Sequence, residues 1–82
     1  MSPTVFTEGR FRYYFFSREE PRPHVHVASA GGEAKFWLNP VGELARNAGL
    51  SDRDIREIQE VIRRRQQEIL DAWNKHFGSG DH

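Results

Sequence analysis

The sequence predicts an α+β domain in which a small antiparallel sheet of three to four strands is followed by a short helix and one long C-terminal amphipathic helix. Short β-prone segments separated by turn residues fill the first half of the chain. In the second half, apolar residues recur at three- and four-residue spacing, and the length of 82 residues suits a single domain. We expect this domain to cover residues 1–78 and a flexible tail to cover residues 79–82.

The first predicted strands are residues 4–6 and residues 11–16, with a turn at Glu8-Gly9 between them. Residues 11–16 are almost entirely aromatic and too few for a stable helix, which is typical of a strand covered on both faces. Such rings can also stack on nucleic-acid bases. Because a small domain with few aliphatic residues needs them in its core, we favour the core role.

The next predicted strand is His24 to Ala28, which alternates so that His24 and His26 lie on one face and two valines lie on the other. Ala30-Gly31-Gly32 is a hairpin turn signal. Residues 34–38 then form the last predicted strand. Its alternation places Lys35 and Trp37 on the face opposite to that of Phe36 and Leu38.

Helical patterns follow. Pro40 suits a first helical turn, and an apolar stripe then marks a short helix over residues 40–48, ended by Gly49. Ser51 is a good N-cap for a long amphipathic helix that continues to Phe77. At about 1.5 Å per residue, that helix exceeds the breadth of such a domain, so it should overhang, bend or pack against a second copy. Arg65 and Gln66 interrupt its apolar stripe.

Composition sets the class of protein. Twelve basic and twelve acidic residues cancel, which gives no overall attraction to nucleic acid, although arginine outnumbers lysine ten to two. Arginine pairs bidentately with phosphates and carboxylates, which is compatible with an anionic partner. There is no cysteine, and no apolar run approaches the ~20 residues of a membrane span. We therefore expect a cytoplasmic protein without a signal peptide.

The segment His24-Val25-His26 is the best candidate for chemistry. Alternate residues on a strand point the same way, with Cβ atoms ~6.5–7 Å apart, so two imidazoles there could act as acid and base. They could also chelate a metal, but a Zn²⁺ site needs a third and usually a fourth ligand. The only candidates for these further ligands are Glu20, Glu33 and His76. A third alternative is that both histidines are structural. We predict no metal and no cofactor.

Other side chains could support a reaction of these histidines. Arg12, Arg22 and Lys35 are candidate binding groups for phosphate, with Lys35 also a candidate catalytic group across the hairpin. Glu20, in the loop before the histidine strand, is a further candidate binding residue.

Together these residues resemble a known family. Its signature is the Pro23-His24-Val25-His26-Val27 segment, and the other matching segments are the 11–17, 34–40 and 72–78 stretches. The family consists of small bacterial and archaeal proteins of unknown function. The resemblance implies a standalone cytoplasmic protein, often encoded beside a second small gene in an arrangement similar to toxin–antitoxin modules.

Three functions are compatible with the sequence. The first is a toxin-like protein that acts on RNA, in the manner of a ribonuclease, and is neutralised by a small cognate protein. The second is a non-enzymatic interaction module or homodimer in which the histidines are structural. The third is a metal-binding protein that uses His24, His26 and a carboxylate. We favour the first hypothesis.

Overall fold

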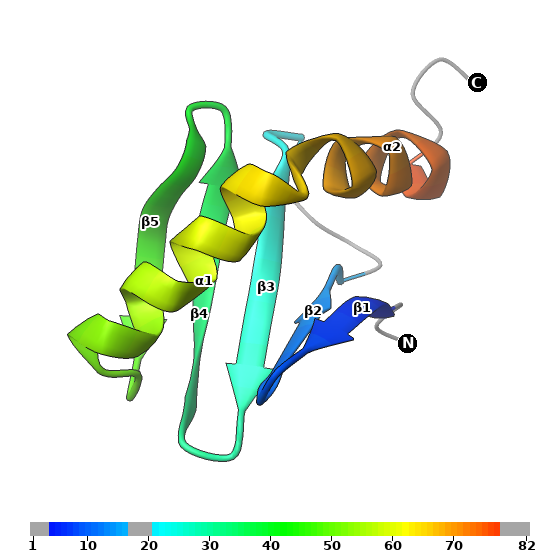
Figure 1. Cartoon of the computed structure of the whole chain (residues 1–82). Coiled ribbons are helices and arrows are strands. Elements are labelled where there is room, and N and C mark those ends of the chain that lie inside the picture. The colour runs from blue at the N-terminus through cyan, green and yellow to red at the C-terminus, as the bar shows by residue number, and fades with distance from the viewer. Residues whose placement is uncertain (1–3, 17–20, 78–82) are drawn as a thin grey trace.

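The computed structural model describes residues 4–16 and 21–77. These residues form one antiparallel sheet in which each strand pairs with its neighbours in the chain, followed by helices (Figure 1). The elements are β1 Thr4–Glu8, β2 Phe11–Tyr14, β3 His24–Ser29, β4 Gly32–Leu38, β5 Val41–Ala48, α1 Asp52–Arg64 and α2 Gln66–Phe77. The division into a domain over residues 1–78 and a tail over residues 79–82 stays a prediction, and the tail lies outside the described residues.

The predicted α+β class is confirmed, but the predicted count of three to four strands is too low, because the sheet formed by the described residues has five strands. The short helix predicted over residues 40–48 is instead β5, which pairs antiparallel with β4. A helix of that length is marginal by itself, whereas a strand gains hydrogen bonds from the edge of the sheet. Gly42 has φ +81°, a conformation outside the helical region, and its carbonyl oxygen accepts a hydrogen bond of 2.9 Å from Nε2 of Gln59.

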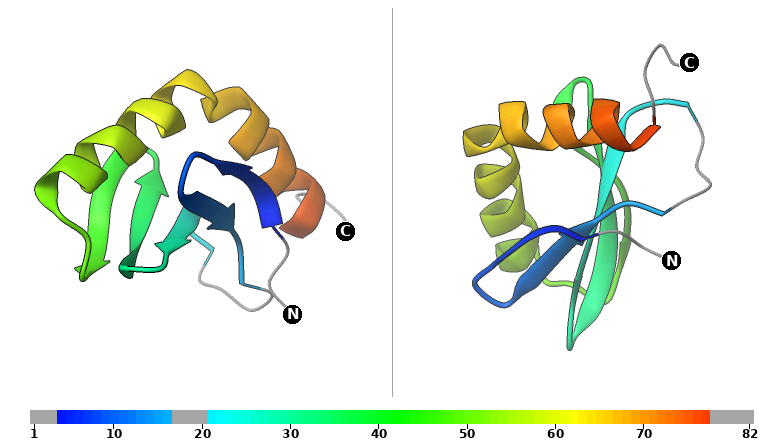
Figure 2. Two further views of the ribbon diagram at one scale, coloured as in Figure 1. Left: turned by 60° about the horizontal axis from the view of Figure 1, so that its bottom comes forward. Right: turned by 90° about the vertical axis from the view of Figure 1, so that its right-hand side faces the viewer.

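The long helix is divided in two by a bend. α1 ends at Arg64 and α2 begins at Gln66, at the point where the polar residues interrupt the apolar stripe. Figure 2 shows α1 lying along one face of the sheet and α2 turning across the end of the sheet where β3 begins. Of the three outcomes expected for an overlong helix, the chain takes the bend.

The core lies between the sheet and α1. Val25 and Val27 of β3 and Phe36 of β4 are fully buried on the face that α1 covers, as the alternation predicts. Ile58 and Ile62 of α1 face them and are equally buried. The sheet therefore has a helix-covered face, which supplies the core, and a second face that carries the remaining side chains of β2 to β5.

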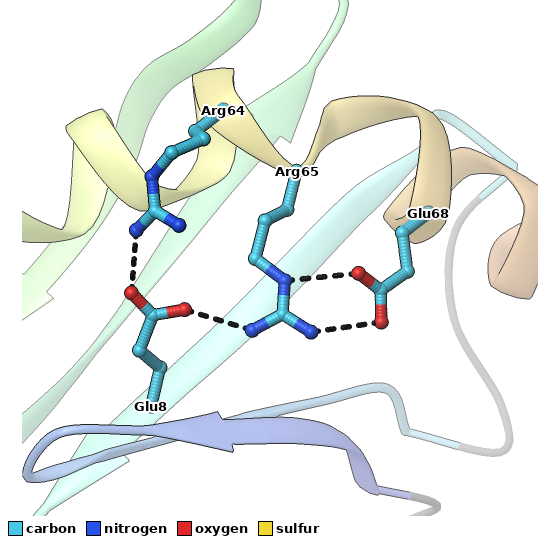
Figure 3. A network of polar contacts seen from close by, with 4 residues as sticks. All are labelled: Glu8, Arg64, Arg65 and Glu68. Carbon is cyan, nitrogen blue, oxygen red and sulfur yellow. Dashed lines mark hydrogen bonds and ion pairs between the residues drawn. The ribbon is translucent and has the colours of Figure 1, made fainter.

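The bend is fixed to β1 by ion pairs (Figure 3). Arg65 forms two hydrogen bonds of 2.9 Å with Glu68 and one of 2.8 Å with Glu8. Arg64 also pairs with Glu8. The guanidinium of Arg65 lies 3.5 Å from the ring centroid of Phe6, so the polar interruption of the helix is partnered rather than left unsatisfied.

Candidate functional site

The face of the sheet turned away from α1, hereafter the open face, carries most of the candidate residues. The strand register aligns Tyr14, His26, Lys35 and Arg46 as successive partners across β2 to β5. Because directly paired residues of antiparallel strands point to the same face, these side chains form one row. Trp37, two residues from Lys35 on β4, lies on the same face.

A groove runs along the open face. Its volume is about 400 Å³, and its lining comprises Phe16, His26, Glu33, Ala34, Lys35, Trp37, Ala45, Arg46 and Ala48. The lining therefore combines three aromatic rings with two cations and one carboxylate. Phe16 is 38% exposed, so its ring is accessible to a ligand at one side of the groove.

His24 is not accessible at this groove. It is fully buried, at 0% exposed, and its Nδ1 donates a 2.7 Å hydrogen bond to the carbonyl oxygen of Arg22. The ring lies edge-on to Trp37 at 5.8 Å and to Trp73 of α2 at 5.1 Å. A group enclosed in this way cannot reach a substrate, which argues against the predicted role of His24 as acid or base.

His26 is half-buried and lines the groove. Its ring stacks on Tyr14 at a centroid distance of 5.4 Å and contacts Phe16 at 4.4 Å. The rings of His24 and His26 lie 5.1 Å apart and nearly perpendicular, at 81°. The two histidines share a face, as the alternation predicts, but only one of them lines the groove.

The predicted cations lie on the open face against aromatic rings. The guanidinium of Arg22 is 4.0 Å from the ring centroid of Trp37, and Nζ of Lys35 is 4.6 Å from it. Arg22 also donates to the carbonyl oxygen of Asn39 and pairs with Glu43 at 3.3 Å. The structure thus brings Arg22 and Lys35 together around one indole.

Arg12 lies on β2, the strand that pairs with β3. Its guanidinium lies 4.4 Å from the ring centroid of Tyr14, and its Nε donates to the hydroxyl of Thr4 at 3.1 Å. Glu20, the remaining candidate, lies outside the described residues. Sequence reasoning missed Phe16 and Arg46 as groove residues. Arg46 was missed because its segment was predicted as a helix, while Phe16 was assigned to the core.

The described residues can be searched for a metal-binding cluster and for a membrane-spanning helix. Within residues 4–16 and 21–77, no three side chains of histidine, aspartate or glutamate come close enough to hold a metal ion. Neither described helix has the length and apolar character required to cross a membrane.

The fold and the open face define a small α+β protein with an aromatic and basic groove on its sheet. The chain belongs to the family described as a domain of unknown function (DUF4160), whose model matches residues 10–74. The matched span runs from just before β2 into α2 and includes every described groove residue. No curated protein and no solved structure matches the chain.

Proposed function

We propose that the chain binds single-stranded RNA in the groove of the open face. The observation that carries the proposal is the groove lining, in which Phe16, His26 and Trp37 supply flat rings beside the ammonium group of Lys35. Single-stranded nucleic acids bind on such surfaces, with bases stacked on rings at about 1–3 kcal/mol per base and phosphates held by cations. Arg12 and Arg22 extend the positive charge beside the groove.

The carboxylate of Glu33 in the groove supports RNA rather than DNA as the ligand. A carboxylate repels phosphate, but it accepts a hydrogen bond from a ribose 2′-hydroxyl, which DNA lacks. In the proposed complex Glu33 therefore faces the sugar while Lys35 faces the phosphate. Binding to an RNA oligonucleotide should exceed binding to the DNA oligonucleotide of the same sequence.

In this proposal the chain is the toxin-like member of a gene pair and is neutralised by a small cognate protein, as the family resemblance implies. RNA cleavage by paired histidines is not included, because the burial of His24 leaves one histidine in the groove. Binding alone can block an RNA from its normal use. Growth arrest on expression should therefore be lost in a Trp37→Ala variant that still folds.

The two lysines of the chain provide a matched test. Lys35 lines the groove, whereas Lys75 is exposed on α2. Affinity should be measured by fluorescence anisotropy with a labelled RNA of about 12 nucleotides, a length within the ~4–16 nucleotides that one OB fold binds. Lys35→Gln should weaken binding about fivefold or more, since a phosphate contact is lost, and Lys75→Gln should leave it unchanged. Equal affinities for the two variants would place the RNA elsewhere.

The second candidate function is a non-enzymatic interaction module in which His24 is structural. The burial of His24 between two tryptophans favours it. If the wild-type chain shows no RNA binding at any accessible concentration, this second candidate replaces the first.

A further inference from the structure

We propose that the outer edge of β5 pairs with β5 of a second copy of the chain about a two-fold axis. The helix-covered faces of both copies then lie on the same side, and the two sheets form one continuous sheet. This interface borders the groove proposed for RNA and shares Arg46 with it. Dimerisation is measured in the absence of RNA, so it can fail or hold independently of the RNA proposal.

The edge itself is suited to pairing. β5 ends the sheet, and with eight residues it is the longest of the described strands. All its residues from Glu43 to Ala48 are exposed. An exposed edge offers unpaired backbone N–H and C=O groups, and proteins protect such edges by shortening, covering, charging or bulging the strand unless a partner uses them. β5 is neither short nor covered along Glu43 to Ala48, although it carries bulges and charges.

A β-bulge determines which side chains share a face. Lys35 pairs with Arg46 whereas the next residue, Phe36, pairs with Leu44, so Ala45 is an extra residue in β5. Glu43, the partner of Trp37, therefore lies on the open face together with Arg46. Leu44 lies between them in the ladder and points to the helix-covered face.

This order of side chains is self-complementary. Consider an antiparallel pair related by a two-fold axis through Leu44, so that the two Leu44 residues meet at the axis. Because Ala45 is the extra residue of the bulge, Glu43 and Arg46 each lie one ladder position from Leu44, on opposite sides of it. Glu43 of each copy therefore lies opposite Arg46 of the other. Leu44 is 39% exposed in the single chain and is one of two large exposed apolar residues among those described. Pairing would cover it and form two intermolecular ion pairs on the open face.

The other edge strand lacks this complementarity. Antiparallel self-pairing of β1 would place Thr4 opposite Glu8, which forms no ion pair between the copies. At β5, the first turns of α1 project past the outer edge of the strand on the helix-covered side (Figures 1 and 2). α1 begins at Asp52, shortly after the C-terminal end of β5, and antiparallel pairing carries the two helix starts to opposite ends of the strand pair (Figure 1).

Charge reversal tests the pairing. The mass of the full chain should be measured by sedimentation equilibrium over a range of concentrations, where the wild type should approach twice its 9.6 kDa. Glu43→Arg and Arg46→Glu should each raise the dimer dissociation constant about tenfold or more, because each places like charges opposite one another twice. The double variant Glu43→Arg/Arg46→Glu should recover the wild-type constant.

Mixing gives the sharpest result. Each single variant repels itself, but a mixture of Glu43→Arg and Arg46→Glu chains places arginine opposite glutamate at both positions. The mixture should therefore form a heterodimer that native mass spectrometry resolves. Leu44→Asp is a second variant that should be monomeric, with circular dichroism showing that it folds. A wild type that stays monomeric at the highest concentration, or single variants that dimerise as well as the wild type, would overturn the proposal.

Discussion

Two histidines on one strand occupy different environments because α2 covers only one of them. His24 stands at the end of β3 that α2 crosses, and Trp73 packs on its ring. His26 lies two residues further along the same face and lines the groove. Identical side chains on the same face thus become a fully buried residue and a half-buried one that lines the groove. The difference arises where α2, a segment distant in the sequence, packs on His24.

This difference predicts unequal effects on stability. His24→Ala should lower the free energy of unfolding by about 3 kcal/mol, since a buried ring and its hydrogen bond to the Arg22 carbonyl are both lost. His26→Ala should lower it by about 1 kcal/mol or less, because the ring is only half-buried. Urea denaturation of the three proteins measures both values, and a larger loss for His26→Ala would contradict the assignment.

Glu8 makes stability depend on pH. The hydrogen bonds from Arg64 and Arg65 lower the pKa of the Glu8 carboxyl below its ordinary value. A carboxyl with a lowered pKa in the folded state stabilises the fold above its unfolded pKa of about 4.3 and loses that effect as pH falls through the folded value. Glu8→Gln should therefore be less stable than the wild type at pH 7, and the gap should close as the pH falls below about 4.

Glu60, which is exposed on α1, provides the control for this titration. Glu60→Gln should follow the wild-type stability across the same pH range. If thermal unfolding shows a gap for Glu8→Gln that persists unchanged at acidic pH, the ion pairs of Figure 3 do not stabilise the bend as charged groups.

Among the elements, β5 shows where sequence patterns mislead. Val41, Leu44, Ala45 and Ala48 recur at helical spacing, and the flanking Pro40 and Gly49 imitate helix boundaries. The true alternation is concealed because Ala45 is an extra residue in the ladder, which breaks the period of two. Local propensity therefore predicts a helix where pairing with β4 favours a strand.

The other elements follow their local signals more closely. The strands at residues 24–28 and 34–38 were predicted with the correct faces, since undisturbed alternation fixes which side chains share a face. The position of Lys35 and His26 on one face could therefore be predicted. The burial of His24 could not be predicted, because it depends on where α2 crosses the sheet. The position of Arg46 in the groove could not be predicted either, because its segment was assigned to a helix.

The hairpin between β3 and β4 contains two adjacent glycines whose substitution by alanine should have very different effects on stability. A Cβ on Gly32 would overlap the carbonyl oxygen of Ala48 and lie 2.8 Å from the carbonyl carbon of Gly49, whereas one on Gly31 would meet only Ser29 Oγ at 3.9 Å. Gly32→Ala should destabilise the domain by about 2–3 kcal/mol, since backbone must shift. Gly31→Ala should change stability by less than about 1 kcal/mol. Similar melting temperatures for the two variants would show that the backbone at the end of β5 can shift away from the added Cβ at little cost.

At the scale of the whole molecule, a net charge of zero conceals an uneven distribution. α1 carries acidic and basic residues in equal numbers along its sequence. The open face instead presents Arg12, Lys35 and Arg46 in its strands, with Arg22 beside them, against Glu33 and Glu43. An anionic ligand thus meets a basic face even though the chain as a whole is neutral, and this removes the main objection to RNA that composition raises.

The salt dependence of RNA binding tests this charge distribution directly. Each phosphate neutralised on a single strand contributes about −0.7 to the slope of log affinity against log salt concentration. With about three or four cations engaged, the slope should be about −2 to −3. Lys35→Gln should make it shallower by about 0.7, because one phosphate contact disappears, and Lys75→Gln should leave it unchanged.

The same titration separates stacking from charge. Trp37→Ala removes a ring and no cation, so it should weaken binding by a similar factor at every salt concentration and keep the slope. Loss of slope in Trp37→Ala would mean that the indole mainly positions Arg22 and Lys35, which both lie over its ring. A wild-type slope near zero would instead show that the cations of the open face do not contact phosphate, and the basic face would need another ligand.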